Sequence, residues 1–328
     1  NPIKQSASDP DDGKTKCGQI WVNELRLSDF TENGGWAANA RLTAKLADFG
    51  NVSLSGNMYT PGFGSIENKV NERKKETLKQ YDISSTLELG KFIPQDYNVH
   101  IPMYVGYSEI FVTPQFNPLD PDLPLAPMLK DPEVSKRIRD SLRFITQDYT
   151  RRKSINFTNV KKDKGKDSKK SHIYDIENWS ATYSYSEFYK RNTMIEFNHL
   201  KDYHGGLMYT YAPQPKNIKP FDKIKFLQPK YFQLIKDINF YLYPNKIGFS
   251  TNVDREYTTN KTRNTTGGEV LILPTYNKRF NMTRNYDFNF DITKGLKLSF
   301  NAMNQERILE PDGAVTDATI DTMKRELF

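Results

Sequence analysis

The sequence predicts an all-β protein whose antiparallel strands form part of the wall of a large transmembrane β-barrel, with long loops and one short amphipathic helix. Apolar and polar residues alternate along many segments, and successive side chains of a strand point to opposite faces of a sheet. Many segments have about nine residues or more, enough to cross a bilayer, whereas soluble strands average about five or six. The alternating polar positions are rich in Ser, Thr, Asn, Asp and Lys, as a wet lumen is, and Tyr and Phe gather near strand ends, as in an interfacial girdle.

The composition excludes several classes of protein. The chain has 328 residues, a formal net charge of +7 and a pI of about 9.1, which is basic but not extreme. A mean hydropathy of −0.73 and the lack of a run of about 18 apolar residues exclude a helical membrane protein. Cys17 is the one cysteine, which excludes an internal disulfide framework and a cysteine-rich metal site. The chain begins without Met and shows no signal peptide, so we expect a mature protein or, more readily, a segment of a longer one.

The first third of the chain divides into a linker and a run of strands. Residues 1–35 are predicted to be a linker and a separate pre-barrel strand, because residues 1–16 are polar and charged and Ile20–Phe30 alternates less cleanly. Residues 36–112 are predicted to be barrel strands, separated by a charged loop at 61–79.

Residues 113–176 are predicted to be a loop insertion. Six prolines between 114 and 132 forbid a regular helix there and give a stiff, extended path. A helix is predicted next, with Asp131 as its N-cap and Pro132 in its first turn. Its apolar stripe is expected to rest on a protein surface, so the helix is a candidate for docking a partner. The stripe consists of Val134, Ile138, Leu142 and Ile145.

The end of this insertion is a Lys-rich run, Lys161–Lys170. Nucleic-acid binding is one interpretation of its six lysines. Two interleaved aspartates and the lack of aromatic residues favour a solvated loop instead. No nucleic-acid partner is therefore expected.

Residues 177–328 are predicted to be barrel strands again, with a Pro- and Lys-rich excursion at 213–236. Residues 193–200 and 207–212 are predicted to be two short strands about a turn at His204-Gly205-Gly206. Together with the strands before the insertion, about eleven or twelve strands are expected.

Two hairpins are predicted in the last part of the chain. Phe240 and Leu242 lead into a turn at 243–246, and residues 247–253 return from it. Phe288–Asn304 alternates on both sides of a tight turn at 293–295.

The alternation assigns side chains to two faces of this wall, an apolar face toward lipid and a polar face toward the lumen. The predicted lipid-facing residues are Leu42, Leu46, Val52, Leu54, Ile101, Met103, Val105, Phe240, Leu242, Phe249, Phe288, Phe290, Leu296, Leu298 and Phe300. The predicted lumen-facing residues are Thr43, Ser53, Ser55, Ser250, Asn252, Asn289, Asp291, Ser299 and Asn301.

No constellation of catalytic residues stands out, and the chain is not expected to be an enzyme. His199 and His204 are five residues apart across a predicted turn, which suits no standard metal spacing. The sequence contains no GxSxG, HExxH or P-loop motif. No catalytic residue, metal site or cofactor is therefore predicted.

Two stretches carry a resemblance to a known family. Ile20–Asn57 (IWVNELRLSDFTENGGWAANARLTAKLADFGNVSLSGN) and Tyr231–Tyr257 (YFQLIKDINFYLYPNKIGFSTNVDREY) are long and peculiar in composition, and Tyr- and Asn-rich strands follow. They resemble the SprA/Sov family, the giant outer-membrane translocon of the type IX secretion system of Bacteroidota. The resemblance runs from about Ile20 to the end of the chain and rests on no catalytic motif. Family members are far longer than this chain, which would then be an interior segment.

The resemblance implies a single very large β-barrel in the bacterial outer membrane, of the type with about 36 strands. Such a barrel conducts folded cargo proteins that carry a C-terminal signal domain, and in gliding relatives it exports surface adhesins. The implied partners are the outer-membrane lipid, the rest of the parent barrel chain, a shuttle barrel protein, a periplasmic plug protein and the secreted cargo. The Pro-rich part of the insertion, 113–150, is the best candidate for a gate, lid or docking surface.

Two other interpretations stay open at this point. A self-closed barrel of about twelve strands would be a porin or receptor for small solutes. A soluble all-β adhesin or carbohydrate-binding protein would also alternate apolar and polar residues. Strand length separates the soluble protein from the two barrels, and the length of the parent chain separates the barrels from each other.

Overall fold

The computed structural model describes residues 33–165, 172–221, 231, 233–265, 268, 270–316 and 320–321. The pre-barrel strand predicted over Ile20–Phe30 lies outside the described residues, as does the second half of the Lys161–Lys170 run.

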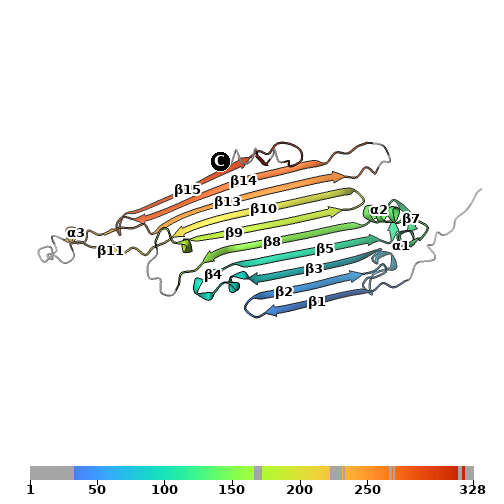
Figure 1. Cartoon of the computed structure of the whole chain (residues 1–328), viewed down its shortest axis with the longest axis horizontal. Coiled ribbons are helices and arrows are strands. Elements are labelled where there is room, and N and C mark those ends of the chain that lie inside the picture. The colour runs from blue at the N-terminus through green and yellow to red at the C-terminus, as the bar shows by residue number, and fades with distance from the viewer. Residues whose placement is uncertain are drawn as a thin grey trace, which may run out of the picture.

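Antiparallel strands make up most of the described chain, which confirms the predicted all-β class. The main sheet has eleven strands in the order β1-β2-β3-β5-β8-β9-β10-β13-β14-β15, with the short β4 also paired to β8 (Figure 1). Their bounds are β1 Ala37–Leu46, β2 Gly50–Tyr59, β3 Glu76–Glu88, β4 Val99–His100, β5 Pro102–Pro114, β8 Asp148–Lys162, β9 Trp179–Arg191, β10 Ile195–Tyr211, β13 Lys246–Thr262, β14 Thr275–Asp291 and β15 Lys297–Ile308.

Small elements lie at the two ends of these strands (Figure 1). Two hairpin-like pairs form separate two-stranded sheets, β6 with β7 and β11 with β12. Their bounds are β6 Phe116–Asn117, β7 Asp120–Pro124, β11 Asn217–Ile218 and β12 Phe240–Tyr241. The helices are α1 Leu125–Lys130, α2 Lys136–Thr146 and α3 Gln233–Lys236, and the 3₁₀ turns are η1 Val70–Glu72, η2 Leu89–Phe92, η3 Gln95–Tyr97 and η4 Ile176–Asn178.

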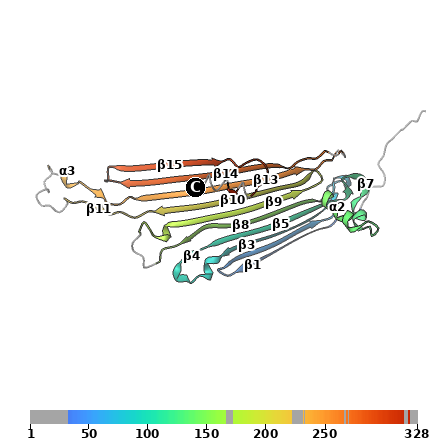
Figure 2. The ribbon, with the colours of Figure 1, turned by 45° about the horizontal axis from the view of Figure 1, so that its top comes forward.

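The sheet is a single layer, as Figure 2 shows. Among the described residues, few large apolar side chains are buried, which a sheet packed under a second layer would not allow. One small cluster, Phe280 with Ile308, lies where the segment after β15 turns back over β13 and β14. There Glu310 accepts two hydrogen bonds from the Arg255 guanidinium, at 2.9 and 3.0 Å. Over most of the described sheet both faces are open, apart from contacts with α2 and with the connection after β8 at the strand ends.

The main sheet begins at β1 and ends at β15, and these two strands do not pair with each other in the described part of the chain. Each therefore presents one row of backbone groups that has no strand partner among the described residues. None of the helices in the described segments is both long and apolar enough to cross a membrane.

The predicted insertion at 113–176 contains a strand of the main sheet, β8, which is a correction. Its alternation is hard to recognise because Arg151 and Lys153 occupy positions on the face that Ile155 and Phe157 share. Pairing with β5 on one side and β9 on the other supplies its backbone hydrogen bonds.

The predicted helix begins later than expected. Ser135, not Asp131, caps α2, and its hydroxyl accepts a hydrogen bond from the Ile138 N–H at 3.4 Å. The Asp131 carboxylate instead accepts from the Glu133 N–H at 2.9 Å, in a local turn that ends before the helix starts. Val134 therefore precedes α2.

A second helix, α1, forms where prolines were expected to forbid one. Pro127 is its third residue, within the first turn, where a backbone N–H would have no acceptor inside the helix. Leu125 at its start is fully buried. The prediction failed because proline blocks a helix interior, not a helix beginning.

Strand β10 replaces the two short strands predicted about His204-Gly205-Gly206. These residues lie in mid-strand, because Gly205 pairs with Tyr183 of β9 and with Val253 of β13. Two ladders offset the weak strand propensity of two glycines.

The two predicted hairpins have different outcomes. Phe240 lies in β12, which pairs with β11 and not with β13, so the hairpin across 243–246 is wrong. The hairpin of β14 and β15 is confirmed, with Phe288 opposite Phe300. Its turn is held by the Thr293 hydroxyl, which accepts hydrogen bonds from the N–H groups of Gly295 and Leu296, at 3.2 and 2.9 Å.

Candidate functional site

The register of the main sheet sorts its side chains onto two faces, because directly paired residues of antiparallel strands share a face. We call the face that carries Leu42 and Leu54 the leucine face, and the face that carries Ser53 and Ser55 the serine face. Eleven predicted lipid-facing residues lie in main-sheet strands, and all share the leucine face: Leu42, Leu46, Val52, Leu54, Met103, Val105, Phe249, Phe288, Phe290, Leu298 and Phe300.

The remaining four predicted lipid-facing residues lie outside these ladders. Ile101 and Leu296 stand immediately before β5 and β15. Phe240 belongs to β12 and Leu242 follows it, so neither extends the leucine face of the main sheet.

All the predicted lumen-facing residues share the serine face: Thr43, Ser53, Ser55, Ser250, Asn252, Asn289, Asp291, Ser299 and Asn301. One row on this face consists of small or polar residues from strand to strand. It runs Thr43, Ser53, Ser84, Gly106, Ser154, Ser186 and Asp202.

The large apolar side chains of the leucine face are exposed. Leu42 is 63% exposed, Leu298 48% and Phe300 56%. An apolar surface of this extent is rare on a protein whose faces all meet water.

The apolar part of the leucine face runs diagonally across the sheet. One row, which we call the central row, pairs Leu42 with Leu54 and Ile83 and then continues on the same face into charged residues. It continues through Tyr107, Lys153, Glu187, Lys201 and Tyr257 to Lys278. On β14, Phe280 and Met282 of this face belong to the cluster with Ile308, and a second apolar group lies ten positions beyond Lys278, at Phe288, which pairs with Ile247 on one side and Phe300 on the other. The apolar band therefore crosses the strands obliquely.

A charged and aromatic region borders the apolar band on the leucine face. We define the cationic belt as the central row and the next two rows toward α2, on β8, β9, β10, β13 and β14. These rows contain six Lys or Arg residues and one carboxylate, that of Glu187. The cationic residues are Arg151, Lys153, Arg191, Lys201, Lys261 and Lys278.

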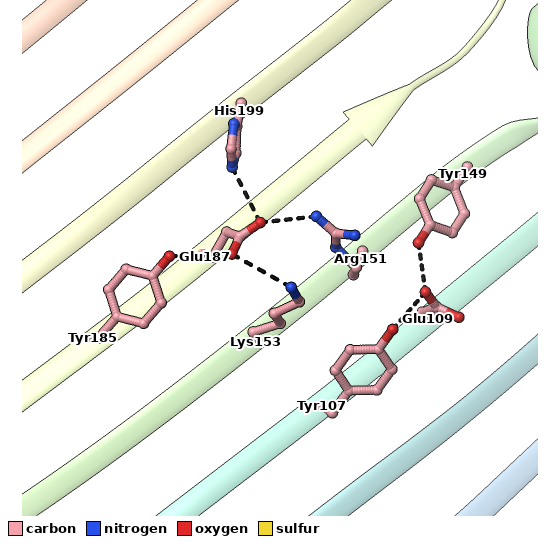
Figure 3. A network of polar contacts seen from close by, with 8 residues as sticks. All are labelled: Tyr107, Glu109, Tyr149, Arg151, Lys153, Tyr185, Glu187 and His199. Carbon is pink, nitrogen blue, oxygen red and sulfur yellow. Dashed lines mark hydrogen bonds and ion pairs between the residues drawn. The ribbon is translucent and has the colours of Figure 1, made fainter. Parts of the chain in front are cut away.

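Glu187 is the centre of the polar network in the belt (Figure 3). Its carboxylate accepts hydrogen bonds from the Arg151 guanidinium at 2.9 Å and the Tyr185 hydroxyl at 3.1 Å. The His199 ring nitrogen lies 3.1 Å away and the Lys153 ammonium 3.7 Å away. Only 11% of the Glu187 side chain is exposed. This carboxylate is thus already engaged by four neighbours.

A second carboxylate stands beside the belt on β5 (Figure 3). Glu109 is buried and accepts hydrogen bonds from the hydroxyls of Tyr107, at 2.6 Å, and Tyr149, at 2.5 Å. Glu109 lies directly opposite Arg151 in the register, so its negative charge faces the belt, although no ion pair joins the two residues in the described part of the chain.

Aromatic rings form a ladder across five strands at the same level. Phe111 lies 6.2 Å from Tyr81 and 4.9 Å from Tyr149, measured between ring centroids. Tyr149 lies 6.0 Å from Tyr189, which is 5.8 Å from the His199 ring. Such a ladder is the arrangement expected of the aromatic girdle of a membrane barrel.

Helix α2 is anchored to the leucine face at the end of these strands. The Arg191 guanidinium lies 4.3 Å from the Phe144 ring and donates a hydrogen bond to the Phe144 carbonyl at 2.5 Å. Arg263 lies 6.0 Å from the same ring. Phe144 is not part of the predicted docking stripe; of that stripe, Ile138 is 60% exposed, whereas Leu142 and Ile145 are half-buried.

At the opposite ends of the strands, ion pairs join β8 to the connection that follows it. The Lys162 ammonium lies 2.7 Å from the Glu177 carboxylate, and its hydrogen bond holds the pKa of Glu177 below its ordinary value. The Lys161 ammonium lowers the pKa of Asp163 in the same way. Both carboxylates are therefore charged at neutral pH.

The described segments contain no group of three or more His, Cys, Asp or Glu residues that could hold a metal ion. Sequence reasoning missed the belt because charged residues at apolar positions of β8, β9 and β10 weaken the period-two pattern. Only the register between strands brings Lys153, Glu187 and Lys201 together.

Residues 3–129 match the family model SprA_N, described as a motility related/secretion protein. The match spans the N-terminal part of the chain as far as α1. No curated protein matches the chain.

Proposed function

We propose, since the chain belongs to the SprA/Sov family, that its main sheet is a section of the wall of an outer-membrane channel that exports folded proteins to the cell surface. The observation that carries this proposal is the oblique apolar band on the leucine face. The serine face would line the channel, and the leucine face would meet lipid.

The direction of the band is what a tilted barrel wall requires. Strands of membrane barrels tilt by about 35–45°, so a row perpendicular to the strands climbs through the bilayer. From β1 to β14 there are eight steps between strands, and the band shifts ten residues, from Lys278 to Phe288. With about 3.3 Å per residue and about 4.8 Å per strand, this shift corresponds to a tilt of about 40°. In a soluble β-sandwich, no bilayer requires the apolar residues to shift along the strands from one strand to the next.

The serine face suits a wide aqueous channel. Its rows carry small hydroxyl and amide side chains, with Gly106 and Gly206 among them, rather than large apolar groups. A folded protein that slides past such a wall meets water-bound polar groups and gains little by adhering to it.

The two open edges favour a wall that continues beyond this sheet. An unpaired strand edge in lipid leaves backbone N–H and C=O groups without partners, at a cost of several kcal/mol for each group. We therefore propose that strands of the rest of the parent chain pair with β1 and β15. The shuttle barrel, the plug protein and the secreted cargo are the further partners proposed for the assembled channel.

The segment between β5 and β8 is the proposed docking surface for one of these partners. It comprises β6, β7, α1 and α2, and it projects from one end of the wall (Figure 1). Residues 116–146 can be replaced by a short Gly-Ser linker without cutting into either flanking strand. Unchanged secretion and unchanged partner binding in that variant would reject the docking role.

Site-specific cross-linking in the secreting cell tests the channel itself. A photo-reactive residue at Asn252 would lie on the serine face, and one at the adjacent Val253 on the leucine face. We expect a cargo protein stalled by a tightly folded fusion domain to cross-link to position 252 and not to position 253.

The opposite pattern, or equal labelling at both positions, would reject the assignment of the lumen. The intact mass of the native chain is a separate check of the wall. A parent of several hundred kilodaltons is expected, whereas a mass near 38.1 kDa would indicate a self-closed small barrel and remove the export proposal.

A further inference from the structure

We propose that the cationic belt binds the phosphate groups of anionic lipid headgroups, so that the wall has a built-in preference for anionic lipid beside β8, β9 and β10. This inference rests on the proposed function, because it requires the leucine face to meet a bilayer. It adds a ligand class and a set of residues to that face.

The excess of positive charge is the first step. The belt holds six Lys or Arg residues and one carboxylate, that of Glu187, and Glu109 on β5 adds a second carboxylate at its edge, so cations remain in excess. Arg151 and Lys153 share that carboxylate, and Lys261 pairs outside the belt with Glu196 at 2.9 Å. No ion pair involves Lys201 in the described part of the chain, and Arg191 donates to a backbone carbonyl.

The contrast with the serine face is the second step. On the same strands, that face balances its charges: Lys190 lies 3.7 Å from Asp148, and Arg279 lies 2.6 Å from Glu256. Arg152 of the serine face lies 5.5 Å from the Phe188 ring and makes no ion pair in the described part of the chain. The larger surplus of cations is therefore on the leucine face, which indicates an anionic partner on that side.

The position of the belt is the third step. It borders the apolar band directly: Ile155 follows two residues after Lys153 on β8, and on β10 Tyr203 follows Lys201 on the same face. It also contains the rings of Tyr149 and Tyr189. Membrane proteins are rich in Lys, Arg and Tyr at the level of the lipid headgroups. There the long cationic side chains reach the lipid phosphates, and the Tyr rings lie at the boundary between the hydrocarbon and water.

The exposure of the lysines is the last step. The Lys153 side chain is 39% exposed, and Lys201 is half-buried. Both residues are directly paired with Glu187 of β9, Lys153 from β8 and Lys201 from β10. Directly paired side chains of an antiparallel sheet start about 5 Å apart, so Lys153 and Lys201, on the two strands that flank β9, start about 10 Å apart. Their long side chains can bring the two ammonium groups to one phosphate from either side of β9. The engaged Glu187 carboxylate between them holds Arg151 and His199 in place.

The experiment compares lipid preference in two matched double variants of the full-length native protein. Lys153→Gln with Lys201→Gln removes two charges from the belt. Arg152→Gln with Lys190→Gln removes two charges from the serine face of β8 and β9. Each protein is reconstituted into phosphatidylcholine bilayers, and the fraction of spin-labelled phosphatidylglycerol that it immobilises is compared with that of spin-labelled phosphatidylcholine.

We expect the native protein to prefer phosphatidylglycerol. Each lysine removed from the belt should reduce the preference about fivefold, the effect of about one cation near an anionic surface. The serine-face variant should keep the native preference. Equal immobilisation of both lipids by the native protein, or equal losses in the two variants, would overturn the belt as a headgroup site.

Two further results separate the competing explanations. If millimolar inorganic phosphate abolished the preference, the belt would bind free phosphate and the lipid assignment would be wrong. If the native protein did not enter the bilayer at all, the proposed function itself would fail. A protein that inserts and shows no lipid preference would leave the wall proposal intact and reject only this inference.

Discussion

Leu42 and Lys278 lie on the same row and the same face of the main sheet, eight strands apart, although one is aliphatic and the other is charged. On a flat sheet buried under a second layer, both positions would have the same surroundings. A tilted barrel wall would place the two residues at different depths in the bilayer, and the depth of each position can be measured.

Depth is the first prediction. A nitroxide attached to a cysteine at Phe288 should be shielded from a water-soluble relaxation agent, and one at Lys278 should be accessible to it. The two positions are ten residues apart on β14, which is about 33 Å along an extended strand. Native cysteines of the parent chain, Cys17 among them, need to be replaced first. Equal accessibility at the two positions would contradict the tilt.

Face polarity is the second prediction. Leu298→Arg places a charge on the leucine face of β15, where an arginine at mid-bilayer costs about 2–4 kcal/mol. Ser299→Arg places the same side chain on the serine face one residue away. The first variant should accumulate less in the outer membrane, and the second should accumulate normally. Protease protection of intact cells measures both, and equal amounts would contradict the assignment of faces.

The Glu187 network gives the third prediction. Glu187→Gln removes a carboxylate that engages Arg151, Lys153, Tyr185 and His199, so it should destabilise the folded wall by about 1.5–3 kcal/mol. The control, Glu256→Gln, loses a more exposed pair with Arg279 and should cost less than about 1 kcal/mol. The midpoint of heat-induced conversion to the unfolded form, read from gel mobility, ranks the variants. A smaller shift for Glu187→Gln than for the control would reject the central role of Glu187.

The anchoring of α2 gives the fourth prediction. Phe144→Ala removes the ring between Arg191 and Arg263, whose cation–π contacts contribute up to about 2 kcal/mol where they are desolvated. Helix α2 should detach, and trypsin should cleave within it faster. Ile138→Ala changes a side chain that is 60% exposed and should leave the cleavage rate as it is. Equal cleavage rates in both variants would show that Phe144 is not the anchor.

The sequence predicted the fold class and the two faces, because both depend on the period-two alternation that single strands carry. Leu298 and Ser299 can be assigned to opposite faces from their neighbours in the chain alone. The β14–β15 hairpin was equally local, since Thr293 and Gly295 determine the turn between two alternating runs.

The missed features depend on contacts between segments far apart in the chain. The sequence predicts a loop at β8 because Arg151 and Lys153 break its alternation, and only β9 supplies the Glu187 that pairs with them. It predicts a turn at Gly205 and Gly206 because their strand state depends on ladders from both neighbouring strands. The cationic belt depends on the pairing register between neighbouring strands, and the sequence of one strand alone does not determine that register.

The oblique band also has a consequence for how the wall assembles. A slip of two residues between neighbouring strands keeps every side chain on its own face, so alternation alone does not exclude it. Such a slip displaces one strand by about 7 Å relative to its neighbour, which separates Lys201 from Glu187 and carries charged groups into the hydrocarbon. In the proposed barrel wall, the thickness of the membrane would thus act as a ruler that rejects misaligned strands during folding. An environment without a fixed thickness, such as a detergent micelle, removes that ruler, and mixed alignments are the expected product.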